Sequence, residues 1–92
     1  MIRSIRHKGL NRLYRDDDSR GVTQEHAEKL RDILARLDAA STVEDMKIPG
    51  FRLHSLQGNR QNSWAVTVRA NWRVVFRFAD GDAWEVDYVD YH

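Results

Sequence analysis

The residues best suited to chemistry lie in the second half of the chain and at its carboxyl end. Arg69, Arg73 and Arg77 recur along two expected strands. His54 comes earlier, and the chain finishes with 90–92, Asp-Tyr-His. Guanidinium groups match the oxygens of a phosphate, and imidazole and carboxylate groups transfer protons near neutral pH. These residue types therefore suit a site that binds phosphate and moves protons.

Each of these features also has an ordinary structural interpretation. Charged faces are common on antiparallel sheets, so the arginines also fit a solvated surface that Asp87 and Asp90 partly neutralise. A single histidine such as His54 is commonly a surface or capping residue. A chain end such as 90–92 is commonly frayed. The residue types alone leave these alternatives open.

Length and composition limit the classes of protein. Ninety-two residues make one domain, 1–92, with a single core. There is no cysteine, which excludes disulfides and thiolate metal sites. The four histidines lack the spacing of metal ligands, and there is no P-loop, GxGxxG or GxSxG motif, so we expect neither a metal nor another cofactor. No apolar run approaches the roughly 18 residues of a membrane helix, and no secretory signal is evident. We therefore expect a cytoplasmic protein without membrane association.

The charges are unevenly distributed, although the formal net charge is only +1. Residues 1–15 and residues 51–79 each carry five basic residues and no acid, whereas 80–92 carry five acids and no base. The chain can therefore present a strongly positive surface. The basic residues near the amino end either dock on nucleic acid or ribosomal RNA, or simply form a solvated helix face. Those assigned to docking are Arg3, Arg6, Lys8 and Arg12.

Apolar periodicity predicts helices in the first half of the chain. A short edge strand is expected at 2–5, followed by a basic helix at about 7–15. A longer helix follows the N-cap Thr23, because its apolar residues recur on a single stripe. Ser41 and Glu44 resemble a capping box for one further turn. The apolar stripe consists of Ala27, Leu30, Ile33, Leu34 and Leu37.

After Gly50 the apolar residues alternate with polar ones, which is typical of strands. The pattern predicts an α+β domain, in which two amino-terminal helices pack on one face of a mostly antiparallel sheet of four to five strands. The other face of the sheet is then open to a partner. The alternating runs are 51–54, 64–69, 72–78 and 84–88.

The register of the last hairpin follows from the rule that neighbouring strands share their apolar face. A two-residue loop at Asp80-Gly81 would mix the faces. A three-residue loop with a glycine bulge instead opposes Val74 to Val86 and Phe76 to Trp84, so we predict the bulged loop.

The same reasoning, applied to the turn at 70–72, places Arg69 opposite Arg73. Arginines that face each other repel unless an anion lies between them. The open face is therefore expected to be cationic. Its expected members are His54, Arg69, Arg73, Arg77 and Tyr91.

Four segments of the chain resemble the HigB toxins, which belong to the RelE/ParE superfamily of type II toxin–antitoxin systems. They are 7–10 (HKGL), 53–60 (LHSLQGNR), 68–73 (VRANWR) and the terminal 90–92 (DYH). The resemblance covers essentially the whole chain, 1–92. The pairing of 68–73 with a terminal DYH is specific, whereas either piece alone would be weak.

The resemblance implies a RelE-like fold and a bacterial endoribonuclease that cleaves translated mRNA in the ribosomal A site. It also implies a helix-turn-helix antitoxin, similar to HigA, through which the pair binds operator DNA. Two alternatives stay open. A ParE-like toxin would inhibit DNA gyrase without catalysis, and an RNA- or ribosome-binding module would use the arginine face only for docking.

Carried over by position, the resemblance also assigns site residues. Relatives often have a basic residue where this chain has Gln57, so one positive charge is missing from the expected phosphate site. The catalytic residues it implies are His54, Arg73, Asp90, Tyr91 and His92. The RNA-binding residues it implies are Gln57, Arg60, Arg69, Asn71 and Arg77.

The chemistry implied needs no metal, because RNA supplies its own nucleophile. The 2′-hydroxyl attacks the adjacent phosphate and leaves a 2′,3′-cyclic phosphate and a free 5′-hydroxyl. Arg73 would stabilise the transition state with help from Arg69. His54 and Asp90 would transfer protons, in an order that the sequence does not fix, and His92 could replace one of them. Tyr91 would stack on or orient a base.

Overall fold

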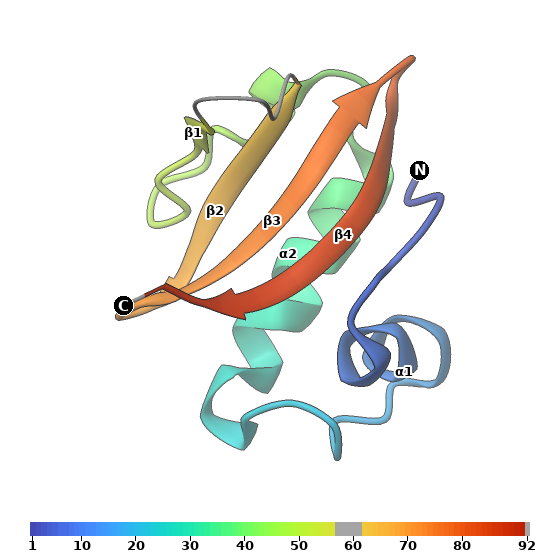
Figure 1. Cartoon of the computed structure of the whole chain (residues 1–92), viewed down its shortest axis with the longest axis vertical. Helices are drawn as coiled ribbons and strands as arrows, with labels where there is room; N and C mark the ends of the chain where they lie inside the picture. The colour runs from blue at the N-terminus through green and yellow to red at the C-terminus, as the bar shows by residue number, and fades with distance from the viewer. Residues whose placement is uncertain (57–61, 92) are drawn as a thin grey trace.

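A computed structural model describes residues 1–56 and 62–91 of the chain (Figure 1). The expectations for Gln57, Arg60 and His92 lie outside the described residues. The elements in chain order are α1 (Lys8–Asp16), the 3-10 turn η1 (Gln24–His26), α2 (Ala27–Ala39), the 3-10 turn η2 (Val43–Met46), β1 (His54–Ser55), β2 (Ser63–Arg69), β3 (Trp72–Ala79) and β4 (Asp82–Asp90).

The four strands form one antiparallel sheet in the order β1-β2-β3-β4. The amino-terminal segment runs beside β4 in the parallel direction, through bridges from Ile2 to Ala83 and from Ile5 to Val86. The expected edge strand at 2–5 is therefore present as a line of isolated parallel bridges rather than as a regular strand. The α+β fold class is confirmed.

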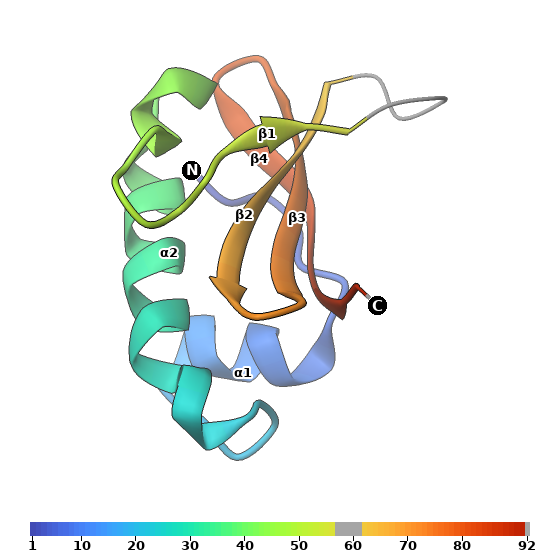
Figure 2. The same cartoon turned by 90° about the vertical axis from the view of Figure 1, so that its left-hand side faces the viewer.

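The helices pack on one face of the sheet. Figure 2 shows α2 running along that face, with α1 next to it. The predicted stripe of α2 is confirmed, because its apolar residues are all buried and three of them, Leu30, Ile33 and Leu37, are completely so. Among the described residues, no helix covers the opposite face of the sheet. In the same part of the chain, no helix is long and apolar enough to cross a membrane.

The helix ends differ in detail from the expectation. Thr23 is the N-cap of η1, which continues directly into α2. The capping box of the later turn is one residue further on than predicted and consists of Thr42 and Asp45. The Asp45 carboxylate accepts the backbone N–H groups of Ser41 and Thr42, and these two hydrogen bonds lower its pKa.

The strand predicted at 51–54 is mostly wrong. Phe51 belongs to a turn and is buried, and Arg52 adopts a left-handed backbone with φ of 51°. This backbone breaks the alternation that the sequence suggested, so pairing begins only at His54, opposite Ala65 of β2. The short strand β1 still places His54 at the edge of the sheet.

The predicted loop of the last hairpin is also wrong. The structure has a two-residue loop, Asp80-Gly81, and Arg77 lies opposite Trp84. The extra residue lies within β4 instead, at Glu85, whose φ is 53° and whose N–H donates to the hydroxyl of Ser4 at 2.8 Å. Because the two-residue loop pairs Trp84 with Arg77, Trp84 lies on the open face rather than on the helix-covered face. The Cζ atom of Arg77 lies over the Trp84 ring, 5.5 Å from the ring centre.

Beyond this bulge the apolar faces of β3 and β4 coincide again. Val74 lies opposite Tyr88 and is completely buried, and Tyr88 is 4% exposed. The sequence argument therefore identified the need for an extra residue but placed it in the turn instead of in the strand.

Candidate active site

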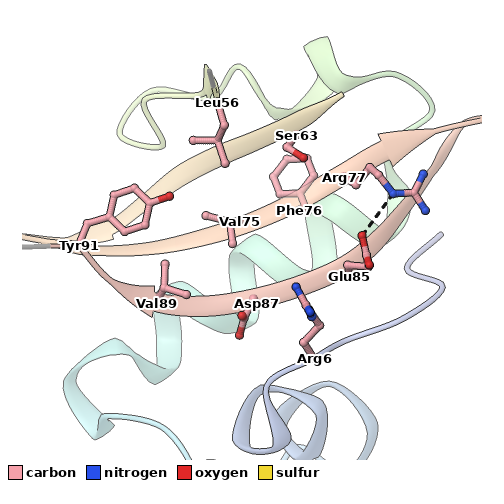
Figure 3. A pocket seen from close by; sticks show the side chains of 10 residues that line it. All are labelled: Arg6, Leu56, Ser63, Val75, Phe76, Arg77, Glu85, Asp87, Val89 and Tyr91. Atoms are coloured by element: carbon pink, nitrogen blue, oxygen red, sulfur yellow. Dashed lines mark hydrogen bonds and ion pairs between the residues drawn. The ribbon is translucent and has the colours of Figure 1, made fainter. Parts of the chain in front are cut away.

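A shallow pocket of about 230 Å³ lies on the sheet face that the helices leave open (Figure 3). Its floor is apolar, and its rim carries guanidinium, carboxylate and hydroxyl groups. The side chain of Tyr91 bounds one end, and Figure 3 shows its hydroxyl directed toward the pocket. The residues that line the pocket are Arg6, Leu56, Ser63, Val75, Phe76, Arg77, Glu85, Asp87, Val89 and Tyr91.

The register explains why these residues meet. Residues that pair directly across neighbouring strands point to the same face. His54, Ala65, Val75 and Asp87 form one such row across all four strands. Because Val75 forms part of the pocket floor, His54 and Asp87 lie on the open face at the two ends of this row. With strands about 4.8 Å apart, the ends of the row are about 14 Å apart.

His54 presents an imidazole to solvent in a defined tautomer. Its Nδ1 lies 3.0 Å from the carbonyl oxygen of Arg52, and the side chain is exposed. A carbonyl can only accept a hydrogen bond, so Nδ1 carries the hydrogen in this contact. The Nε2 atom is then unprotonated in the neutral ring and is available to take a proton.

Arg73 is held by the turn between β2 and β3. Its Nη1 donates to the carbonyl oxygens of Ala70 at 2.5 Å and Trp72 at 3.1 Å. Thr67 and Val89 flank it across the strands, and Val89 also lines the pocket. Arg73 therefore lies on the open face, but its guanidinium group is fixed at the turn rather than in the pocket.

The carboxyl end of β4 is attached to the same turn. The backbone N–H of Tyr91 donates to the carbonyl oxygen of Asn71 at 2.8 Å. Tyr91 is 42% exposed, so part of this residue is accessible to a partner. Asp90 lies opposite Trp72, so the register directs it toward the helix side, at the exposed end of the strand. Asp90 and Tyr91 therefore approach the end of the sheet from different faces.

Arg69 is not on the open face, and the expected pairing of Arg69 with Arg73 is wrong. An irregularity between Thr67 and Arg69 places Arg69 opposite Trp72, while Arg73 lies opposite Thr67. The guanidinium group of Arg69 pairs instead with Glu25 of η1, with 3.2 Å between Nη1 and Oε2. This ion pair draws Arg69 toward the helix layer.

Two groups on the pocket rim were not expected there. Arg6, assigned from the sequence to ribosome docking, lines the pocket because its backbone N–H donates to Val86 at 2.7 Å. Of the two carboxylates on the rim, Asp87 was considered only as a neutralising charge and Glu85 was assigned no role. The parallel pairing of the amino-terminal segment and the bulge in β4 bring these residues together, and no local sequence signal marks either feature.

The cations of the open face differ in how they are paired. Arg77 pairs with Glu85, with 3.4 Å between Nε and Oε2. Within residues 1–56 and 62–91, the side chain of Arg6 has neither a hydrogen bond nor an ion pair. Arg6 is therefore the pocket cation with most capacity for an incoming anion.

The other basic residues near the amino end occupy different places. Arg3 pairs with Asp82, with 3.1 Å between Nε and Oδ2. Lys8 and Arg12 are exposed on α1, whose opposite side buries Leu10 and Leu13. The basic residues assigned to docking are thus divided between an ion pair, the pocket and the outer side of α1.

The structure thus brings His54, Arg73, Arg77 and Tyr91 onto one face, with Asn71 in the turn beside them. In the described part of the chain, no cluster of three or more His, Cys, Asp or Glu side chains could hold a metal ion. The open face thus offers an exposed imidazole, guanidinium groups and a partly exposed aromatic ring beside a pocket with an apolar floor.

Comparison with known proteins identifies the family. A family model described as the RelE-like toxin of the type II toxin–antitoxin system HigB matches residues 3–92. The chain belongs to the HigB-like toxin family. It is 39% identical over 92 residues to a protein of Proteus vulgaris named Endoribonuclease HigB, and the match covers all of both chains. It is 32% identical over 94 residues to Toxin HigB-1 of Vibrio cholerae, a match that covers all of this chain and 98% of the relative.

Membership in the HigB-like family confirms the resemblance seen in the sequence motifs. A toxin of a type II system has a cognate antitoxin as its partner. The α+β arrangement of two helices and an antiparallel sheet agrees with the RelE-like description of the family.

Proposed function

We propose that this HigB-like toxin is an endoribonuclease that cleaves translated mRNA in the ribosomal A site. The observation that carries the proposal is the uncovered sheet face, where His54 and Arg73 lie on the same side as a pocket lined by Tyr91 and by Arg6, a cation without a partner among the described residues. Such a face suits an extended, negatively charged polymer better than a small ligand. The name of the Proteus vulgaris relative, an endoribonuclease, agrees with this activity.

Cleavage proceeds by attack of the RNA 2′-hydroxyl on the adjacent phosphorus. The Nε2 of His54 takes the proton of the 2′-hydroxyl as the new P–O bond forms. The bond from phosphorus to the 5′-oxygen then breaks, and that oxygen leaves with a proton from an acid at the carboxyl end. The proposed acids are His92 and Asp90, and Asp90 reaches the phosphate around the exposed end of β4. The products are a 2′,3′-cyclic phosphate and a 5′-hydroxyl, so no water and no metal enter the balance.

Arg73 and the pocket position the RNA. The three N–H donors of Arg73 that the turn does not use stabilise the charge of the pentavalent intermediate. The exposed ring of Tyr91 stacks on a base that is turned out of the strand, above the apolar floor at Val75 and Val89. Arg6 binds a neighbouring phosphate. Asn71, Arg77, Gln57 and Arg60 contact the RNA around this centre.

The proposed partners follow from the proposed substrate. Lys8 and Arg12, on the outer side of α1, dock on ribosomal RNA while the opposite part of the molecule enters the A site. The toxin then acts in the cytoplasm, where translation takes place. The antitoxin is a helix-turn-helix protein, and the complex binds operator DNA through the antitoxin alone.

The test is a reconstituted translation reaction with a defined reporter mRNA. We expect cuts within codons, only when ribosomes translate the message, with 2′,3′-cyclic phosphate at the upstream fragment. Deleting 90–92 should abolish the cuts while the protein still binds ribosomes. Binding to ribosomes with intact mRNA in the wild type would instead indicate a docking module. Intact mRNA together with inhibition of DNA gyrase would indicate a ParE-like toxin.

A further inference from the structure

A buried aromatic cluster lies beneath the end of the sheet that carries the candidate active site. His26 of η1 is 5% exposed, and its Nδ1 lies 2.5 Å from the hydroxyl oxygen of Tyr88 in β4. Tyr88 stacks on Trp72 of β3, with 4.5 Å between the ring centres and 26° between the planes. His26 also meets Trp72 edge-on at 5.5 Å, and His7 meets Tyr88 edge-on at 5.3 Å.

His26 cannot take part in the proposed chemistry directly. It lies on the helix side of the sheet and is buried, whereas the pocket opens on the other side. His7 already has a structural role, because its Nδ1 accepts the N–H of Leu10 as the N-cap of α1. The hydrogen bond between His26 and Tyr88 therefore needs another explanation.

The cluster and the site share the same backbone. Trp72 directly precedes Arg73 and pairs across the sheet with Asp90. Tyr88 directly precedes Val89, which lines the pocket. Because successive strand residues point to opposite faces, any shift of these two rings displaces the neighbouring site residues on the other face.

The hydrogen bond between His26 and Tyr88 fixes the position of the Tyr88 ring, which stacking on Trp72 alone would leave adjustable. Two stacked rings can slide with little loss of contact, whereas a hydrogen bond has a preferred distance and direction. His26 lies where η1 meets α2, so the bond ties Tyr88 to the helix layer. Both polar atoms are buried, and each would lose its partner if the rings moved apart.

We propose that His26 and Tyr88 form a positioning pair, which holds the ends of β3 and β4 in the geometry that RNA cleavage requires. The inference rests on the proposed endoribonuclease function. The pair acts through Trp72 and the backbone at 88–91 and does not touch the substrate. It is therefore expected to govern the rate of cleavage more than the binding of ribosomes or mRNA.

The test compares Tyr88→Phe with Tyr14→Phe. Tyr14 donates to the Oδ1 of Asp38 at 2.8 Å and joins α1 to α2 away from the open face, so its loss is a matched removal of one tyrosine hydrogen bond. Both variants are assayed at a temperature at which circular dichroism shows them fully folded. Tyr88→Phe should lower the single-turnover cleavage rate by about 10- to 100-fold, with ribosome affinity changed less than twofold. Tyr14→Phe should cleave as the wild type does.

Two further measurements separate positioning from general stability. Hydrogen exchange at the Tyr91 amide, which is bonded to Asn71, should accelerate in Tyr88→Phe and not in Tyr14→Phe. His26→Asn places an amide near the position of Nδ1 and should retain more activity than His26→Leu at equal folding. The comparison of His26→Asn with His26→Leu also applies if Tyr88→Phe folds poorly.

Equal cleavage rates and equal Tyr91 exchange in Tyr88→Phe, Tyr14→Phe and the wild type would overturn the inference and leave the proposed function intact. Equal activity of His26→Asn and His26→Leu would do the same. A wild-type protein that leaves translated mRNA intact would overturn the proposed function, and the positioning role would fall with it.

Discussion

Replacing Arg73 with alanine is the most direct test of the candidate site. Its Nη1 uses its hydrogens on the carbonyl oxygens of Ala70 and Trp72, at 2.5 and 3.1 Å. The Nε–H and the two N–H groups of Nη2 are left for a phosphate. The turn therefore holds the guanidinium group in place before substrate arrives, which is the condition under which such donors are most effective.

The structure allows the two effects of Arg73→Ala to be compared. Removing a preorganised donor from a charged transition state lowers rates by about 10²–10³, equivalent to about 2.7–4 kcal/mol. The two hydrogen bonds to carbonyl groups contribute about 1–3 kcal/mol to folding together. A domain of this kind has about 5–15 kcal/mol of stability, so the variant should remain folded. Arg73→Lys keeps the positive charge but loses the planar arrangement of guanidinium donors, so its cleavage rate should lie between those of Arg73→Ala and the wild type.

The assay is single-turnover cleavage of a reporter mRNA on programmed ribosomes, with fragment ends mapped at nucleotide resolution. Arg36→Ala is the control, since Arg36 lies on α2 and pairs with Asp32 at 2.9 Å, on the helix layer rather than on the open face. Arg73→Ala that cleaves within twofold of the wild type would refute the assigned role. Equal loss in Arg73→Ala and Arg36→Ala would show that the effect is not specific to the site.

Three other predictions follow from individual contacts. Arg6→Ala should lower the slope of log affinity against log salt for single-stranded RNA by about 0.7. Arg3→Ala should leave this slope unchanged, because Arg3 already pairs with Asp82. Equal slopes for the two variants would exclude a phosphate contact of Arg6. Gly9→Ala should destabilise the fold by about 1–3 kcal/mol or more in urea unfolding, because a Cβ there would lie 2.0 Å from the Gly21 carbonyl oxygen, and unchanged stability would contradict this packing. The hydrogen bonds that lower the pKa of Asp45 stabilise the folded state when its carboxylate is ionised. This contribution is complete above the ordinary aspartate pKa of about 3.9 and is lost as the pH falls below that value. Asp45→Asn should therefore flatten the acid side of the stability–pH curve, and a parallel curve would argue against the capping role.

The helices, and the side of the sheet that they leave uncovered, were predictable because both depend on local periodicity. The stripe from Ala27 to Leu37 repeats at helical spacing, and a helix can bury such a stripe only against one face of a sheet. The alternation of Arg73, Val75 and Arg77 placed these residues on the other face. The family motifs were equally visible, because they are contiguous segments.

The strand irregularities were not predictable, because distant contacts stabilise them. The left-handed backbone of Glu85 is accompanied by a hydrogen bond to Ser4, 81 residues away in sequence. The turn after Arg69 likewise has Ala70 at φ of 51°, and the ion pair with Glu25 connects segments 44 residues apart. One-residue shifts of this kind reversed the expected faces of Trp84 and Arg69, so parity arguments failed beyond each bulge.

The segment that brings Arg6 to the pocket also covers the first half of β4, an outer strand of the sheet. Unpaired N–H and C=O groups along an outer strand are templates for self-association. Here the hydrogen bonds of Arg3 and Arg6 to β4, and of Ala83 and Val86 back to the segment, occupy that row. The opposite border is β1, which is only two residues long. The first half of β4 and the short strand β1 therefore offer few unpaired backbone groups to the sheet edge of another molecule.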